Sequence, residues 1–147
     1  MIKVQESDFE INIEINKITS QNKNIGGIGS FIGIVRSGED QKLKSMTLEH
    51  YPKMTEKMLE KINKEAQNRW NLIDSIIIHR YGKLLPGDQI VLVATFSQHR
   101  KDALESCEFL IDWLKTKAPF WKLEERESGK KWVEENRKDL ETVKNWE

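Results

Sequence analysis

The chain has 147 residues, of which 33% are charged and 37% hydrophobic, and its 24 basic and 24 acidic side chains cancel to a formal net charge of zero. This length fits a single domain over residues 1–147, and the neutral balance disfavours binding to nucleic acid, because proteins that bind it are usually basic. One cysteine excludes an internal disulfide, three scattered histidines show no zinc-ligand spacing, and no apolar run approaches the roughly 18–20 residues that span a membrane, so we expect a cytoplasmic protein without membrane contact.

The first quarter of the chain is predicted to be rich in strands. Residues 2–4 suit a short strand, and residues 9–15 are apolar at every second position. That period of two is typical of a half-buried strand, although the same residues could also begin a helix. Residues 25–36 form an apolar, β-rich run with four glycines, and glycine within a strand usually marks a bulge or the close approach of another backbone.

An amphipathic helix is predicted in the middle of the chain, after a strand at residues 46–51. Pro52 suits the first turn of this helix, because its fixed φ angle is already helical. Lys and Glu fill one face, so the opposite face is expected to be buried. That apolar face consists of Met54, Met58, Leu59, Ile62, Ala66 and Trp70.

Two strands are predicted next, at residues 73–81 and 89–97. The sequence Leu-Pro-Gly-Asp at residues 85–88 between them is a tight-turn signal. The second strand is strongly apolar, and we therefore expect it to be central in its sheet.

A second amphipathic helix is predicted from about residue 100 to residue 117. Pro119 ends it, because the residue before a proline is driven out of the helical conformation. Residues 122–135 are typical of a hairpin, and the charged residues 136–147 of a marginal helix or tail. The buried stripe of the helix is expected to consist of Ala103, Cys107, Leu110, Ile111, Leu114 and Ala118. The order of elements predicts an α+β fold, with an antiparallel or mixed sheet, two main amphipathic helices and a C-terminal hairpin.

Three cationic residues mark the ends of predicted elements. Arg36 ends the glycine-bearing strand, where an arginine beside bare backbone can hold a phosphate or a carboxylate bidentately, or can simply be solvated. His99 and Arg100 lie at the start of the second helix, where unsatisfied N–H groups and the helix dipole favour an anion. Two cations at that end therefore indicate that an anion binds there. The alternative is that no ligand binds and the two residues are simply an unfavourable choice at the start of a helix.

Two lysines flank the proline that ends the second helix. Lys115 lies at the edge of the apolar stripe and Lys122 lies beyond Pro119, so a turn at the proline can bring the two amines together. An amine in such a pocket can act as base or nucleophile when neutral and as an acid when protonated. The competing interpretation is that both lysines extend along the surface to solvent. Cys107 falls on the buried stripe, which favours a packing role over a reactive thiol.

Several segments in order resemble the catalytic, large subunit of molybdopterin synthase, the MoaE family. The resemblance covers about residues 25–135. The segments are Gly33-Ile34-Val35-Arg36, Thr47-Leu48-Glu49-His50-Tyr51-Pro52, Met54-Thr55-Glu56-Lys57, Asn68-Arg69-Trp70, Ile78-His79-Arg80, Gly82 with Pro86-Gly87-Asp88, Ser97 with His99-Arg100, Leu114-Lys115-Thr116, Ala118-Pro119-Phe120-Trp121-Lys122, and Gly129 with Trp132-Val133-Glu134. The proline-aromatic-lysine segment with the His-Arg pair upstream is its most specific part.

The resemblance implies an α/β-hammerhead-type fold and a sulfurtransferase of molybdenum cofactor biosynthesis. Such an enzyme converts cyclic pyranopterin monophosphate (precursor Z) into molybdopterin by installing the dithiolene sulfurs. The sulfur comes from a small ubiquitin-like partner subunit, whose C-terminal Gly-Gly carries a thiocarboxylate and inserts into a pocket of the large subunit. A homodimer of large subunits within a heterotetramer is implied, and no further cofactor is expected.

The resemblance also assigns roles to residues. Lys115 and Lys122 are implied as the catalytic lysines, either as acid/base groups or in transient covalent contact with the partner's C-terminal carbonyl. An arginine near the C-terminus, reaching in from the other protomer, is implied as well, and Arg137 is the nearest candidate. The substrate-binding set implied for this chain is Ile34, Val35, Arg36, His99, Arg100, Lys115, Lys122, Leu123 and Glu124. The alternative function is a non-catalytic dimeric α+β module that binds an anionic ligand or a partner's C-terminal tail.

Overall fold

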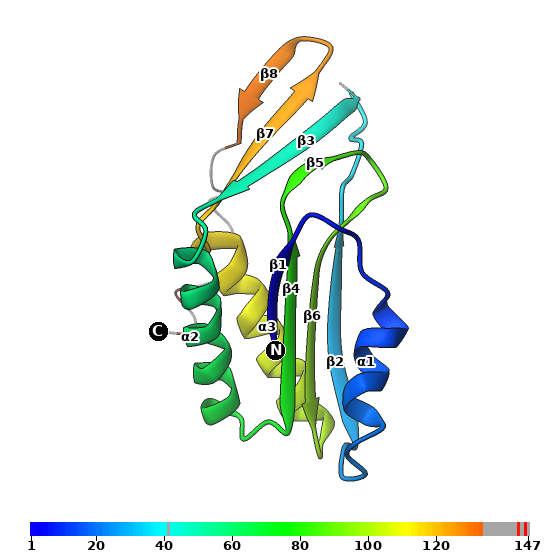
Figure 1. Cartoon of the computed structure of the whole chain (residues 1–147), viewed down its shortest axis with the longest axis vertical. Helices are drawn as coiled ribbons and strands as arrows, with labels where there is room; N and C mark the ends of the chain where they lie inside the picture. The colour runs from blue at the N-terminus through cyan, green and yellow to red at the C-terminus, as the bar shows by residue number, and fades with distance from the viewer. Residues whose placement is uncertain (41, 134–143, 145, 147) are drawn as a thin grey trace.

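The computed structural model describes residues 1–40, 42–133, 144 and 146. In these residues two four-stranded sheets lie end to end, with helices around the first (Figure 1). The elements in chain order are β1 (Ile2–Gln5), α1 (Ile11–Thr19), β2 (Gly27–Ile34), β3 (Leu43–His50), α2 (Met54–Arg69), β4 (Asp74–Arg80), β5 (Gly82–Leu84), β6 (Gln89–Ser97), α3 (Arg100–Thr116), β7 (Phe120–Arg126) and β8 (Gly129–Trp132). The prediction of an α+β fold is confirmed.

The first sheet has the strand order β1-β4-β6-β2. Only the β1–β4 pair is parallel, and the β4–β6 and β6–β2 pairs are antiparallel. Strand β6 has the predicted bounds and the predicted central position, and its residues Leu92 to Phe96 are all buried. Such a strand is apolar along its whole length because both of its faces are covered.

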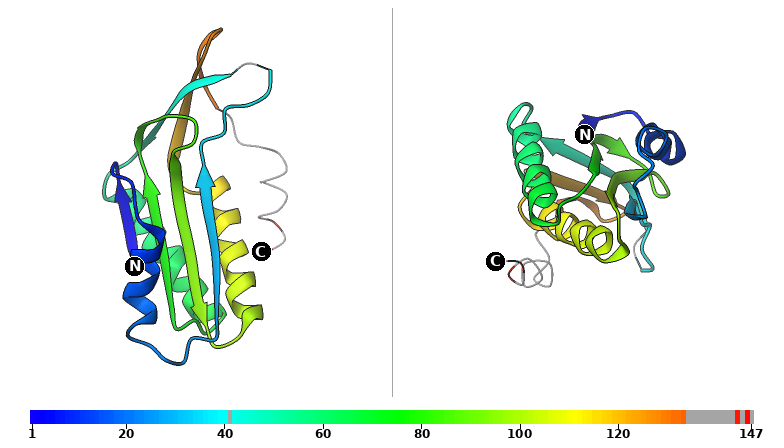
Figure 2. Two further views of the ribbon diagram at one scale, coloured as in Figure 1. Left: turned by 90° about the vertical axis from the view of Figure 1, so that its right-hand side faces the viewer. Right: turned by 90° about the horizontal axis from the view of Figure 1, so that it is seen from below.

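Helices cover both faces of this sheet (Figure 2). Helices α2 and α3 pack on one face, where Leu59 and Leu110 join Ile77 and Val93 of the sheet in one core cluster. Helix α1 covers the other face, where Ile76 and other sheet residues form a second cluster. No helix in the described part of the chain is long and apolar enough to cross a lipid bilayer.

The second sheet has the order β5-β3-β7-β8 and is antiparallel throughout. The predicted C-terminal hairpin is present as β7 and β8, with Gly129 in the positive-φ conformation at its turn. One face of this sheet packs on Val35, which follows β2 and forms a third core cluster with Leu43, Met46, Leu48 and Leu84 of the sheet. The small sheet thereby extends the far end of the first one.

Two details of the helices differ from the sequence predictions. Residues 9–15 enter helix α1, so the strand interpretation is wrong and the helical alternative is correct. Ile11, Ile15 and Ile18 pack against the sheet with helical spacing, whereas Ile13 is 55% exposed. In α2 the buried face is rotated, because Thr55 and Asn63 are buried while Met54, which was expected inside, is 49% exposed.

Close contact between β2 and α3 explains one of the glycines predicted to permit backbone approach. A Cβ atom at Gly29 would lie 2.2 Å from the carbonyl oxygen of Ala103 in α3. The neighbouring Thr95 hydroxyl donates to that same oxygen at 2.6 Å. The first turn of α3 therefore packs directly against the backbone of β2.

Candidate active site

A cavity of about 560 Å³ lies where the two sheets and the C-terminal end of α3 meet. It is bounded by β2 and the segment after it, by the end of α3 and by β7. The lining residues are Phe31, Ile32, Gly33, Ile34, Val35, Arg36, Gly38, Met46, His79, Ile90, Val91, Ile111, Leu114, Lys115, Thr116, Ala118, Phe120, Lys122, Glu124 and Arg126.

Six of the predicted site residues line this one cavity: Ile34, Val35, Arg36, Lys115, Lys122 and Glu124. The β2–β6 register shifts between Gly33 and Ile34. Such a shift redirects a strand and its side chains, and here it precedes the segment that carries Arg36 into the cavity lining. The predicted glycine-associated irregularity is thus present, and it lies beside the site.

The turn at Pro119 brings both predicted lysines to the cavity. Helix α3 ends at Thr116 and β7 begins at Phe120. Lys115, in the last turn of the helix, and Lys122, near the start of the strand, therefore both line the cavity. The Lys115 ammonium lies 6.0 Å from the centroid of the Phe31 ring on β2. That is the distance at which an aromatic face attracts a cation.

Glu124 and Arg126 form an ion pair in the cavity wall. The Glu124 Oε2 atom accepts from Arg126 Nη2 at 2.8 Å and from Nε at 3.1 Å. Residues two apart on a strand share a face, so Lys122, Glu124 and Arg126 form a row along the cavity side of β7.

A buried histidine forms part of the cavity wall. The His79 ring stacks on Phe120, with centroids 3.7 Å apart and planes inclined by 13°. His79 Nδ1 donates a hydrogen bond to the Arg80 carbonyl oxygen at 2.9 Å. Burial lowers the pKa of His79 to about 4, so the imidazole is neutral at physiological pH. Its place in the cavity wall was not among the predictions from the sequence.

The remaining predicted residues do not join the cavity within one chain. His99 and Arg100 are exposed at the N-terminal end of the 17-residue helix α3. At the usual helical rise that end is roughly 22 Å from Lys115. A single cleft that unites them with the lysines is therefore absent from the described part of the single chain. Leu123 lies on the opposite face of β7, beside Trp132 of β8. Arg137 falls outside the described residues.

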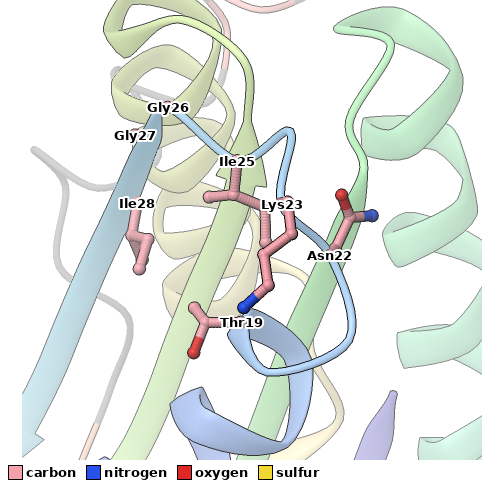
Figure 3. A pocket seen from close by; sticks show the side chains of 7 residues that line it. All are labelled: Thr19, Asn22, Lys23, Ile25, Gly26, Gly27 and Ile28. Carbon is pink, nitrogen blue, oxygen red and sulfur yellow. The ribbon is translucent and has the colours of Figure 1, made fainter.

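A separate hollow lies near the His99 end of the molecule (Figure 3). Thr19 at the end of α1 and Asn22 and Lys23 on the connection after it line this hollow together with residues 25–28. Gly26 packs directly against the chain just before α3, because a Cβ atom there would lie 2.0 Å from the Gln98 carbonyl oxygen. The hollow and the cavity at the C-terminal end of α3 are therefore distinct.

Phe31, His79 and Arg126 are among the cavity residues that reasoning from the sequence did not assign to the site. Phe31 resembles a core residue because it lies inside an apolar strand. Arg126 resembles one of many surface charges, and only its even spacing from Lys122 along a strand could have pointed to it. His79 stands in one of the segments that carry the family resemblance, but its place in the cavity could not be predicted because its neighbours there come from distant parts of the chain.

The cavity is suited to an anionic ligand. Among its described lining residues, four side chains are cationic (Arg36, Lys115, Lys122 and Arg126) and Glu124 alone is acidic. Apolar walls strengthen the attraction between these charges and an anion by excluding water. No cluster of three or more potential metal-ligating His, Cys, Asp or Glu side chains occurs in the part of the chain that the structure describes.

Comparisons with known proteins agree on one family. The model of the MoaE protein family matches residues 4–117. The "Molybdopterin synthase catalytic subunit" of Ralstonia nicotianae is 48% identical over 146 residues, which are 99% of this chain and 83% of the relative. Its counterpart from Escherichia coli K12 is 47% identical over 82% of this chain and 81% of its own length.

Solved structures extend the likeness to the fold. The MoaE protein of Burkholderia ambifaria MC40-6 matches with a TM-score of 0.86 and 48% identity, covering 99% of this chain and 97% of that one. The crystal structure of molybdopterin synthase from Staphylococcus aureus matches with a TM-score of 0.81 and 31% identity, covering 90% of this chain and 96% of its own.

Proposed function

The chain belongs to the MoaE family, and from that membership we propose that its cationic cavity is the site where molybdopterin is made. The protein is the catalytic subunit of a molybdopterin synthase, a sulfur-transferring enzyme of molybdenum cofactor biosynthesis. Its substrate is cyclic pyranopterin monophosphate, and its small ubiquitin-like partner subunit brings sulfur as a C-terminal thiocarboxylate. The observation that carries this proposal is the meeting of Arg36, Lys115 and Lys122 in one cavity.

The charge of the cavity supports a phosphorylated substrate. Arg36 offers a planar guanidinium for bidentate contact with a phosphate, and the two lysines offer further positive charge. The apolar ring of Phe31, which also lines the cavity, suits the flat pterin. We assign Arg36 to the phosphate, together with the backbone of residues 34–35 and 122–124.

The environment of Cys107 supports a sulfur source outside this chain. The thiol is 6% exposed, and burial raises its pKa to about 11, so it is protonated at neutral pH. A protonated, buried thiol is neither a nucleophile nor an acceptor for transferred sulfur. A free cysteine also suits a cytoplasmic location, which we propose for the reaction.

Lys115 and Lys122 are assigned to the chemical step. Sulfur transfer forms a carbon–sulfur bond on the pterin, at a carbon that loses an oxygen substituent, and breaks the bond between that sulfur and the partner's carbonyl carbon, which takes an oxygen from water and leaves as a carboxylate. Protons must move at both centres, and an amine beside each supplies the acid or base. Attack of one amine on the partner's carbonyl is the covalent alternative, and trapping of that amide-linked species distinguishes the two routes.

We further propose that His99 and Arg100 act on the cavity of a second protomer. They are too far from Lys115 to reach it within one chain, and they are exposed. The test is complementation between two inactive variants, Lys115→Ala and Arg100→Ala. In a mixed dimer, action across protomers leaves one of the two sites with both groups intact, so about half of the wild-type turnover should return. Action within one protomer leaves both sites damaged and restores none.

The assay of the proposed function is conversion of the cyclic pterin precursor by this chain mixed with its thiocarboxylated partner. Lys115→Ala and Lys122→Ala should each lower turnover by roughly 10²–10⁴-fold, the range for a lost acid or base. Lys101→Ala removes an exposed lysine from the same helix outside the cavity lining and serves as the matched control. Near-normal turnover of both cavity variants would refute the assignment. Partner binding with no turnover by the wild-type chain would favour the non-catalytic module.

A further inference from the structure

The alternating charges on the cavity face of β7 have a function beyond simple attraction of an anion. Lys122, Glu124 and Arg126 line the cavity in sequence, and successive members of the row are about 7 Å apart along the strand. The acidic member lies between the two cations. Glu124 is also the sole carboxylate among the cavity's described lining residues.

The structure pairs this carboxylate with Arg126. Both Nε and Nη2 of the guanidinium donate to Oε2, at 3.1 and 2.8 Å. The side chains are 29% and 22% exposed, so the pair is largely shielded from solvent. Strand β7 lies between β3 and β8, with Glu124 opposite Met46 and Lys131, which fixes the backbone under both residues.

An unneutralised carboxylate at position 124 would weaken the binding of an anion in two ways. It would repel the anion directly, and it would compete for the ammonium group of Lys122 one step along the row. At about 7 Å and an effective dielectric constant near 20, one unit charge changes an affinity by about tenfold after screening. The guanidinium of Arg126 neutralises the Glu124 carboxylate through direct hydrogen bonds.

We propose that Arg126 is a positioning residue that neutralises Glu124 and so keeps the cationic cavity available to an anionic ligand. The ligand class is a phosphate ester, and in that respect the inference rests on the proposed function. Arg126 acts through Glu124 and does not itself contact the ligand. Its removal should therefore weaken ligand binding more while residue 124 is charged than when that residue is neutral, because only a charged Glu124 can compete for the Lys122 ammonium.

A double-mutant cycle tests this dependence. The four proteins are the wild type, Arg126→Gln, Glu124→Gln and the double variant. Two quantities are measured for each: KM for the cyclic pterin in the reconstituted synthase, and the dissociation constant for inorganic phosphate from the phosphate-dependent rise in Tm. With Glu124 present, Arg126→Gln should raise both about tenfold and change kcat less than twofold. In the Glu124→Gln background the same substitution removes only the direct attraction of the Arg126 charge, so it should raise both quantities by a clearly smaller factor, about threefold or less.

Arg126→Lys is the matched control, because it keeps the positive charge and should hold both quantities within about threefold of wild type. If the glutamine variant melts below the assay temperature, Arg126→Met supplies a second neutral side chain with a similar stem. An equal loss in both backgrounds would mean that Arg126 binds the ligand itself, and no loss in either would mean that the pair is irrelevant. Both results overturn the proposal. Absence of turnover in the wild type would instead overturn the proposed function, while the phosphate measurement would still report on the cycle.

Discussion

Acidification should destabilise the folded chain through His79. This imidazole is 7% exposed, stacked on Phe120 and hydrogen-bonded to the Arg80 carbonyl. Burial lowers its pKa to about 4; the hydrogen bond to the Arg80 carbonyl opposes this shift, and electrostatic interactions with Lys122 and His50 add to it. An unfolded histidine titrates near pH 6.5. Between about pH 6.5 and pH 4 the unfolded chain therefore binds a proton that the folded chain does not.

The sign and size of the effect follow from proton linkage. Because the unfolded state binds more protons in that range, the free energy of unfolding falls as the pH falls. The stabilisation is fully present above about pH 6.5 and is lost on the way to pH 4. A difference of about 2.5 pKa units corresponds to about 3 kcal/mol, a large part of the stability of a domain of this size.

The assay is urea unfolding at a series of pH values between 4 and 7.5. His79→Phe keeps a flat ring against Phe120 and carries no proton, so its free energy of unfolding should fall by about 3 kcal/mol less over this range than that of the wild type. His99→Gln removes an exposed imidazole and should keep the wild-type pH dependence. Parallel curves for wild type and His79→Phe would refute the reasoning.

Two further substitutions test the chemistry and the packing. Cys107→Ser should keep full turnover while lowering the free energy of unfolding by about 1–3 kcal/mol, because a hydroxyl replaces a thiol in an apolar cluster; a folded but inactive variant in the synthase assay would contradict the proposed sulfur route. Gly29→Ala should cost about 3 kcal/mol or more in urea unfolding, because its Cβ would lie 2.2 Å from the Ala103 carbonyl oxygen. Ser30→Ala, at the exposed neighbouring position, should change stability by less than about 0.5 kcal/mol, and an equal loss in both variants would refute the packing argument.

The helices and strands with one clear hydrophobic period were predictable from the sequence. Strand β6 and helix α3 have nearly the predicted bounds, since an unbroken apolar run and a proline stop are local signals. Helix α1 was ambiguous because its isoleucines satisfy two periods at once. Only the sheet face beneath it decides that Ile11 and Ile15 are buried while Ile13 is exposed.

The division into two sheets could not be predicted, because strand pairing joins residues that are far apart in the chain. Strand β3 pairs with β7, which begins 70 residues after His50 at Phe120. The separation of Arg100 from Lys115, by contrast, could be predicted, because both residues lie near opposite ends of the predicted helix. Because α3 is continuous from Arg100 to Thr116, one chain cannot bring both residues to the same cleft.

The sequence by itself determined the family, the α+β class and the turn that carries Lys115 and Lys122 to one cavity, because motifs, hydrophobic periods and the Pro119 break are properties of neighbouring residues. The tertiary structure alone decided that Phe31, His79 and Arg126 line the same space as the two lysines. That meeting depends on how β2 and β4 pair within the first sheet and β7 within the second, and such pairing is fixed by the burial of whole faces rather than by any local pattern.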